Sequence, residues 1–146
     1  MTHLLYAIML LASTFALSCN EGPEPINYGK DACDHCRMTI MDPKFGAELV
    51  TAKGKVYKFD DVNCMVSFMN EGPAKGQEAS HVLIVDFPRP MTLIPVKDAH
   101  FLRSDEVRSP MASGVAAFND ARQRAQHLDK WGGELMNWED VKTAFE

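Results

Sequence analysis

The segment from Ala47 to Asn70 constrains the fold of this chain more than any other. Two short runs, Ala47–Thr51 and Val56–Phe59, have strand patterns and are separated by a Lys-Gly-Lys turn, which predicts a β-hairpin. Asp60 follows at once and can cap a helix over about residues 61–70. The apolar residues of that helix recur three and four positions apart, as on the buried face of a helix. The segment therefore predicts the order strand, strand, helix.

The same order recurs in the second half of the chain. Phe59-Asp60-Asp61 leads into the first predicted helix, and Phe118-Asn119-Asp120 leads into the second. The pattern predicts an α+β fold of two ββαβ-like units, roughly residues 31–87 and 96–146, packed as one duplicated domain. The remaining predicted elements are strands at residues 81–87, 99–103, 115–118 and 134–137, a helix at 120–131 and a terminal helical turn at 139–145.

The start of the chain predicts an export signal. Residues 4–17 are apolar and uncharged, a run that is short for a membrane span and typical of a signal-peptide core. Ala16-Leu17-Ser18 ends the run and Cys19 follows, an order that resembles a bacterial lipobox, in which the cysteine is lipidated. The signal lacks Lys and Arg, and Ala16 stands where lipoboxes prefer leucine. We expect a lipoprotein signal peptide at residues 1–18 and lipidation of Cys19.

The residues after the signal predict a tether and then a domain. Residues 19–30 are rich in Pro, Gly and charged side chains, a composition typical of a flexible tether. The mature domain is expected at residues 31–146. No apolar run beyond residue 18 approaches the roughly 20 residues of a membrane span. The lipid would hold the exported protein at a membrane, on its periplasmic or cell-surface side.

The charge distribution and the motif content argue against two functional classes. The net charge is −5 and the Lys and Arg residues are scattered, so the chain lacks the basic stripe with which proteins bind nucleic acid. No Ser-His-Asp order, paired acidic motif or glycine-rich phosphate loop stands out. We therefore expect no nucleic-acid partner, and we expect that the protein is not an enzyme.

Three sulfur-bearing residues stand close together at Cys33, Cys36 and Met38. The two cysteines of a CxxC motif can converge on one ion, and the Met38 thioether adds a neutral, soft ligand. Soft ligands select Cu(I), and loose two- or three-coordinate binding suits a carrier that must give up its ion. His35 can add an imidazole. Cys64 falls at helical spacing in the predicted helix and is expected to be a small core residue.

A CxxC motif by itself has three other interpretations. In an oxidising compartment it can form a structural disulfide. It can also be a thioredoxin-like redox pair, although that fold needs a strand and a helix before the motif and only the short tether lies there. Zinc is the third interpretation, but structural zinc prefers four Cys or His ligands, and a second CxxC or an HxxxH pair is absent.

Several segments together resemble the NosL family of copper-binding lipoproteins, which are associated with nitrous-oxide reductase maturation. The resemblance covers nearly the whole mature chain and implies a duplicated ββαβ fold that binds Cu(I) through Cys and Met. It also implies delivery of copper to a multicopper reductase outside the cytoplasm. The matching segments are Cys33-x-x-Cys36-x-Met38, Asp42-Pro43-x-Phe45-Gly46-Ala47, Tyr57-x-Phe59-Asp60, Ser109-Pro110-Met111, the alanine-rich helix after Phe118 and Gly132-Gly133.

The resemblance implies a specific set of ligands. These are Cys36, Met38 and Met111, with Cys33 beside them. Met111 occupies the loop of the second predicted unit that corresponds to the CxxCxM loop of the first. A pseudo-twofold arrangement of the units would therefore bring Met38 and Met111 to one ion.

The chain departs from the family pattern at two positions. Arg37 stands where members often carry glycine, and Trp131 stands where a histidine usually precedes the Gly-Gly pair. We expect a membrane-anchored Cu(I) chaperone whose partners are nitrous-oxide reductase and its maturation machinery. Two alternatives stay open at this point. One is a copper-sequestering lipoprotein without a client, and the other is a thiol–disulfide oxidoreductase that uses Cys33 and Cys36.

Overall fold

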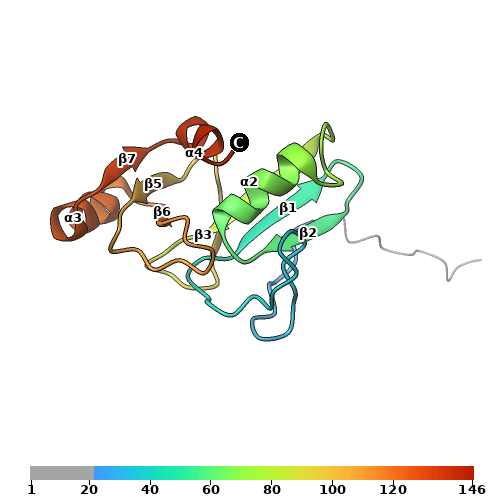
Figure 1. The fold of residues 1–146 in the computed structure, drawn as a ribbon, viewed down its shortest axis with the longest axis horizontal. Coiled ribbons are helices and arrows are strands. Elements are labelled where there is room, and N and C mark those ends of the chain that lie inside the picture. The colour runs from blue at the N-terminus through green and yellow to red at the C-terminus, as the bar shows by residue number, and fades with distance from the viewer. Residues whose placement is uncertain (1–21) are drawn as a thin grey trace, which may run out of the picture.

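The computed structural model describes residues 22–146. The predicted signal peptide at residues 1–18 and the predicted lipidation site Cys19 lie outside the described residues. The described chain forms seven strands and three helices, arranged in two small antiparallel sheets (Figure 1). The α+β class predicted from the sequence is therefore confirmed. Within residues 22–146, no helix is long and apolar enough to cross a membrane.

The first sheet has the strand order β2-β1-β3-β4, and all its neighbouring strands are antiparallel. Helix α2 lies across β1 and β2 (Figure 1) and buries one face that includes Cys64, Met65 and Phe68. The elements of this half are β1 (Ala47–Thr51), β2 (Val56–Phe59), α2 (Val62–Glu71), β3 (Ala79–Val85) and β4 (Leu93–Pro95).

The second sheet has the strand order β6-β5-β7 and is also antiparallel. Gly133 leads into β7 with a φ of 116°, and a Cβ at this position would collide with the carbonyl oxygen of Arg103 on β5. The close approach of β7 to β5 therefore requires glycine. The elements of this half are β5 (His100–Arg103), β6 (Val115–Phe118), α3 (Ala121–Trp131), β7 (Glu134–Met136) and α4 (Trp138–Ala144).

Both sheets place the first strand of their unit at the centre. β1 lies between β2 and β3, and β5 lies between β6 and β7. Duplicated ββαβ units would share this order, but the duplication itself stays a prediction. β4 extends only the first sheet and is not among the predicted elements, because a three-residue strand is too short to show a period of two.

One large hydrophobic core joins the two halves. Phe59 of β2 and Phe101 of β5 are both fully buried and belong to the same cluster of core side chains. Truncation of either ring to alanine is expected to cost about 3–5 kcal/mol. A second, smaller cluster lies under α3, where Phe87 packs edge-on against Trp131 with ring centroids 5.4 Å apart.

Helix α2 begins one residue later than the sequence predicts. Asp61, not Asp60, is its N-cap, and its carboxylate accepts the backbone N–H of Val62 at 2.7 Å. Asp120 caps α3 from the equivalent place in its own Phe-x-Asp sequence. Asp60 is buried beside Cys33, where it has a different environment. The sequence could not separate the two aspartates because either of them can accept a helical N–H.

The chain before Asp31 is packed against the first sheet. Ile26 and Tyr28 pack on the main core, and a Cβ on Gly46 would meet both of their side chains within 2.7 Å. The backbone N–H of Glu24 donates to the buried carboxylate of Glu48 on β1 at 3.0 Å. The part of the predicted tether from Glu24 onward thus has fixed contacts, because its two large apolar side chains find sites on the domain.

Candidate metal centre

Three thiols from two parts of the chain form a compact cluster. Cys33 and Cys36 lie in the turn that precedes β1, and Cys64 lies in the first turn of α2. Their three sulfur atoms are all within 4.8 Å of one another, and none of the three residues is in a disulfide. Cys33 and Cys64 are buried, while Cys36 is partly exposed. One ion placed among them could contact all three sulfurs.

Backbone hydrogen bonds hold the CxxC turn in shape. The N–H of Cys33 donates to the carbonyl of Met38 at 2.8 Å, and the N–H of Arg37 donates to the carbonyl of Cys33 at 2.9 Å. Asp34 ties the turn to β2, because its N–H donates to the carbonyl of Lys58 and its carboxylate accepts the N–H of Lys58, both at 2.8 Å. The cysteine turn is therefore an extension of the β1–β2 hairpin.

Arg37 has a backbone conformation that ordinary residues rarely adopt. Its φ is 67°, in the left-handed region that glycine adopts without strain. Its side chain is 73% exposed and lies 3.8 Å from the carboxylate of Asp34, so the guanidinium points to solvent and pairs with an acid. The backbone at Arg37 thus has a conformation that favours glycine, and the arginine side chain is not held in the sulfur cluster.

The structure sets Cys33 apart as the thiolate of the cluster. The S–H of Cys64 donates to the Cys33 sulfur, and this bond is the main reason why the pKa of Cys33 falls to about 5. Backbone N–H groups of Cys36, Asp60 and His35 also point at this sulfur and lower the pKa, while burial opposes the shift. Cys33 is therefore an anion at neutral pH although its side chain is fully buried.

The pKa values of the other two thiols are shifted in the opposite direction, upward. Burial raises the pKa of Cys36, and the neighbouring Cys33 raises it further. The pKa of Cys64 is strongly raised, first because its proton is held by Cys33 and then because it is buried. At neutral pH the cluster thus contains one thiolate and two thiols, and a metal ion that binds all three sulfurs must displace two protons.

Asp60 adds a titratable carboxyl group next to the cluster. Its pKa is raised to about 6, mainly by burial and next by the negative charge of Cys33. The N–H of Met41 donates to this carboxylate and partly offsets the rise. One carboxyl oxygen of Asp60 is buried without a hydrogen-bond partner. The negative charge of the ionised Asp60 carboxylate is therefore only partly stabilised by its surroundings.

The methionine predicted beside the cysteines points outward. The backbone N–H of Met38 donates to the Cys36 sulfur, while its side chain is 57% exposed. The Met38 backbone therefore lies at the rim of the cluster, and its thioether is accessible to a partner protein. His35 is also exposed, and the group that it directs at Cys33 is its backbone N–H.

The backbone of Met111, the second predicted methionine ligand, is hydrogen-bonded to the start of helix α2, which carries Cys64. The backbone N–H of Met111 donates to the Asp61 carboxylate at 3.1 Å, and its carbonyl accepts from the Asn63 amide at 2.9 Å. Its side chain is half-buried against the core that contains Cys33 and Cys64. The structure thus brings the Met111 loop, far away in the sequence, to the start of α2.

Cys64 is the site residue that sequence reasoning did not assign. The expectation that it is a small core side chain is correct as far as burial goes, since it is 3% exposed. Its sulfur nevertheless completes the three-thiol cluster. One feature of the sequence could have indicated this role, namely that Cys64 stands three residues after the capping Asp61 and so in the first turn of its helix. When a helix follows a hairpin, its first turn can face the loop before that hairpin, and here that loop carries the CxxC motif.

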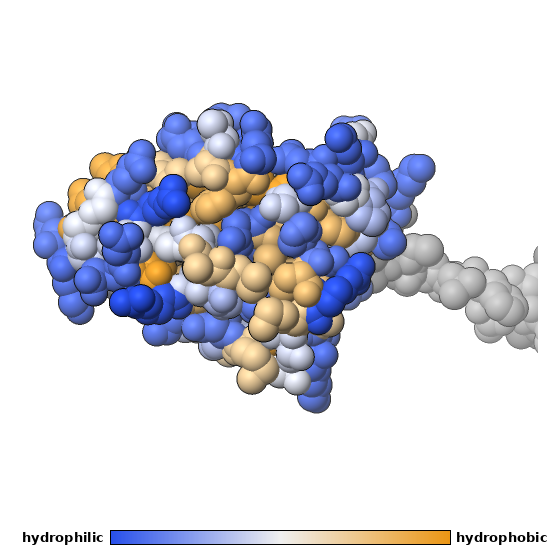
Figure 2. All heavy atoms as spheres, viewed as in Figure 1, coloured by the Kyte–Doolittle hydropathy of each residue, from blue (hydrophilic) through white to orange (hydrophobic). Residues whose placement is uncertain are grey.

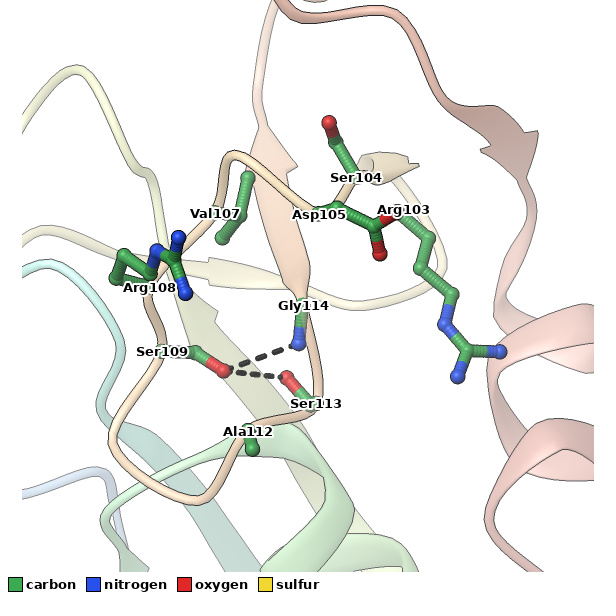
Figure 3. A pocket seen from close by; sticks show the side chains of 9 residues that line it. All are labelled: Arg103, Ser104, Asp105, Val107, Arg108, Ser109, Ala112, Ser113 and Gly114. Atoms are coloured by element: carbon green, nitrogen blue, oxygen red, sulfur yellow. Dashed lines mark hydrogen bonds between the residues drawn. The ribbon is translucent and has the colours of Figure 1, made fainter.

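The two hollows nearest to the predicted site residues do not contain the three thiols. A cavity of about 380 Å³ lies along the β5–β6 loop (Figure 3), where the Ser109 hydroxyl accepts the N–H of Gly114 and bonds the Ser113 hydroxyl. No sulfur-bearing residue lines this cavity. It lies beside the loop that carries Met111. A smaller hollow of about 260 Å³ adjoins the cysteine turn at His35 and Arg37.

The donor set fits a soft metal ion. Thiolates bind Cu(I) and zinc, and an exposed thioether at Met38 favours Cu(I). Structural zinc sites use four ligands, whereas the described cluster of cysteines has three members. The cluster could therefore hold a metal ion, and its composition matches the low coordination numbers of Cu(I).

Comparisons with known proteins identify the family and the fold of this chain. The family model NosL matches residues 26–145. Among solved structures, the fold is similar to the copper chaperone NosL from Shewanella denitrificans, with a TM-score of 0.73 and 20% sequence identity. That match covers 85% of this chain and 98% of the other. No curated protein sequence matches the chain. The match to the family model spans most of the sequence, and the chain belongs to the NosL family.

Proposed function

We propose that this protein is a membrane-anchored Cu(I) chaperone that delivers copper to an extracytoplasmic copper enzyme, nitrous-oxide reductase. The observation that carries the proposal is the cluster of Cys33, Cys36 and Cys64, with sulfur atoms within 4.8 Å of one another. Membership of the NosL family supports it, as does the structural likeness to a protein named a copper chaperone. In this role the chain carries an ion and catalyses no covalent step.

The five sulfur donors have different tasks in this proposal. Cys33 is the ready thiolate, and Cys36 and Cys64 complete the resting site as they lose their protons. Cu(I) binds only two to four ligands, so all five sulfurs cannot hold it together. Met38 at the rim and Met111 on its loop act as exchange ligands during uptake and release.

The positions of the thiols argue against the oxidoreductase alternative. A thiol–disulfide exchange enzyme needs an accessible thiolate that can attack a substrate disulfide. Here the thiolate, Cys33, is fully buried, and the partly exposed thiol, Cys36, has a raised pKa. The protonation states are thus the reverse of what attack on an external disulfide requires.

The anchor is the second part of the proposal. Lipidation of Cys19 would leave four residues, 20–23, before the packed chain begins at Glu24. At about 3.5 Å per extended residue, the domain would stay within roughly 20 Å of the lipid headgroups. Incorporation of labelled palmitate into the wild type in a bacterial host, and none into Cys19→Ser, is the expected result.

An anaerobic Cu(I) titration against a competing chelator tests the copper site. We expect one tight equivalent in the reduced domain and a loss of affinity of about tenfold or more in Cys36→Ser and Cys64→Ser. Met38→Leu and Met111→Leu should instead slow the transfer of Cu(I) between protein and chelator, because these two thioethers act during uptake and release. Met136→Leu, a buried methionine change outside the site, is the control and should bind as the wild type does. Transfer rates that do not change in Met38→Leu and Met111→Leu would falsify the role of the thioethers, and the absence of tight Cu(I) binding in the wild type would favour a redox function.

A measurement of copper transfer distinguishes a copper chaperone from a copper-sequestering protein. The loaded protein is mixed with apo nitrous-oxide reductase, and the copper content of each partner is measured after separation. A chaperone loses its copper to the enzyme faster than a small-molecule copper complex of equal affinity does. Retention of copper by the loaded protein would support the copper-sequestering alternative instead.

A further inference from the structure

Three methionine side chains are exposed to solvent on the loops before β1 and between β3 and β4. Among residues 22–146, the exposed large apolar side chains are Met38 (57%), Met41 (65%), Met91 (67%) and Leu135 (48%). An apolar side chain gains free energy from burial, so exposed apolar side chains that lie close together can mark a binding site. Met38 already has a role in the proposed site, whereas Met41 and Met91 have none.

Met41 and Met91 lie on two loops that are bonded to each other. The backbone N–H of Met91 donates to the carbonyl of Pro43 at 2.8 Å, and only two peptide units separate Pro43 from Met41. Two unbranched side chains at such positions are long enough to reach a common ion. Pale orange apolar atoms do lie on the surface over the loops below α2 (Figure 2).

The loop that carries Met41 adjoins the thiol cluster. The backbone N–H of Met41 donates to the carboxylate of Asp60, and the N–H of Asp60 donates to the Cys33 sulfur. Met41 is thus connected to the buried thiolate through one residue. An ion bound at Met41 and Met91 would therefore be held by a loop that also contacts the thiol cluster.

The backbone supplies an independent observation. Within the described chain, three residues other than glycine have a positive φ: Arg37, Met91 and Ala112. Arg37 precedes Met38, Ala112 follows Met111, and Met91 is itself the strained residue. Left-handed backbone in ordinary residues costs about 1–3 kcal/mol and gathers at functional sites. A positive φ therefore lies at Met91 and directly beside Met38 and Met111.

We propose that Met41 and Met91 form a second, outward-facing thioether site that holds Cu(I) on its way to the thiol cluster. This inference rests on the proposed copper-carrying function. Thioethers are neutral and bind Cu(I) more weakly than thiolates do, so the ion would move inward down a gradient of affinity. Passage is a ligand exchange in which one Cu–S contact replaces another and copper stays Cu(I).

The test is an anaerobic Cu(I) titration of protein labelled with ¹³C in the methionine methyl groups, followed by NMR. Cu(I) has a filled d shell, so each methyl signal can be followed separately. Signals are assigned from the single variants Met41→Leu and Met91→Leu. Leu135→Met is the matched control, because it places one exposed thioether on β7 at a position that already carries an exposed apolar side chain.

The first equivalent of Cu(I) is expected to saturate the thiol cluster. The second is expected to shift the Met41 and Met91 methyl signals together, with one common dissociation constant. Either single variant should raise that constant about tenfold or more. Unmoved signals for Met41 and Met91, or shifts no larger than that of the methionine at position 135, overturn the inference. Tight binding of the first equivalent in the same samples would leave the proposed function intact, whereas its absence would count against that function.

Discussion

The backbone N–H of Met111 donates to the Asp61 carboxylate over 3.1 Å, and this bond joins the two halves of the molecule at the sulfur site. The same carboxylate caps α2 and accepts the hydroxyl of Ser113 at 2.7 Å. Cys64 stands three residues beyond Asp61 in the first turn of α2. The buried Asp61 side chain therefore holds both the helix that carries Cys64 and the loop that carries Met111.

Replacement of Asp61 by alanine is expected to destabilise the protein by about 3–5 kcal/mol, because it removes a helix cap and leaves buried donors on Met111 and Ser113 unpaired. Urea unfolding of the reduced, metal-free domain measures the change. Asp120→Ala is the matched control, since Asp120 caps α3 near the surface and its loss should cost only about 1 kcal/mol. Equal losses in the two variants would contradict a joining role for Asp61. Asp61→Asn, which keeps one acceptor oxygen, should lie between them.

The reduced, metal-free protein is expected to keep one thiolate down to a pH of about 5, the pKa of Cys33. The ultraviolet absorbance of thiolates, measured against pH, should lose this step in Cys33→Ser. An unfolded thiol has a pKa near 9.0, so Cys33 contributes stability that is complete above that pH and is lost as the pH falls through about 5. Cys36 and Cys64 have raised pKa values, and their contribution is complete below 9.0 and is lost at higher pH.

The difference in unfolding free energy between the wild type and Cys33→Ser should therefore widen as the pH rises from about 5 toward 9. Comparison with the variant removes the contribution of distant carboxyl groups, which titrate in both proteins. A constant difference across that range would show that Cys33 is not the preferred anion.

Copper affinity is expected to rise with pH near neutrality. Cys36 and Cys64 are both protonated at neutral pH, so Cu(I) that binds all three sulfurs releases about two protons per ion. The chelator competition repeated at several pH values should give an increase of about two powers of ten in affinity per pH unit. Cys64→Ser should halve this slope. An unchanged slope in that variant would exclude Cys64 as a ligand.

Arg37→Gly is expected to stabilise the protein by about 0.5–1 kcal/mol, since glycine relieves the left-handed strain but adds entropy to the unfolded chain. Copper affinity should not change, because the Arg37 side chain is 73% exposed and paired with Asp34. Lys97→Gly serves as the control for an exposed loop residue without a positive φ, and it should destabilise by about 0.5–1 kcal/mol. Thermal unfolding of the two variants measures both effects, and equal destabilisation by the two changes would show that Arg37 is unstrained.

Local patterns predicted much of the fold. The strands Ala47–Thr51, Val56–Phe59 and Val115–Phe118 have the bounds that the sequence predicts, because turn residues mark their ends. The strand Leu93–Pro95 is not visible in the sequence, since it is too short to carry a pattern and exists only where β3 offers an edge. The start of α2 is ambiguous by one residue for the same local reason, because two adjacent aspartates can both cap.

The sequence by itself determined the α+β class, the CxxCxM motif and the resemblance that selects a copper site. Only the tertiary structure decided that Cys64 joins Cys33 and Cys36, that Cys33 carries the negative charge, and that the Met38 side chain faces solvent. The physical reason is the range of the interactions. Strands, turns and caps depend on neighbours within a few residues, whereas the thiol cluster exists because α2 packs back across the hairpin and places its first turn over the cysteine loop.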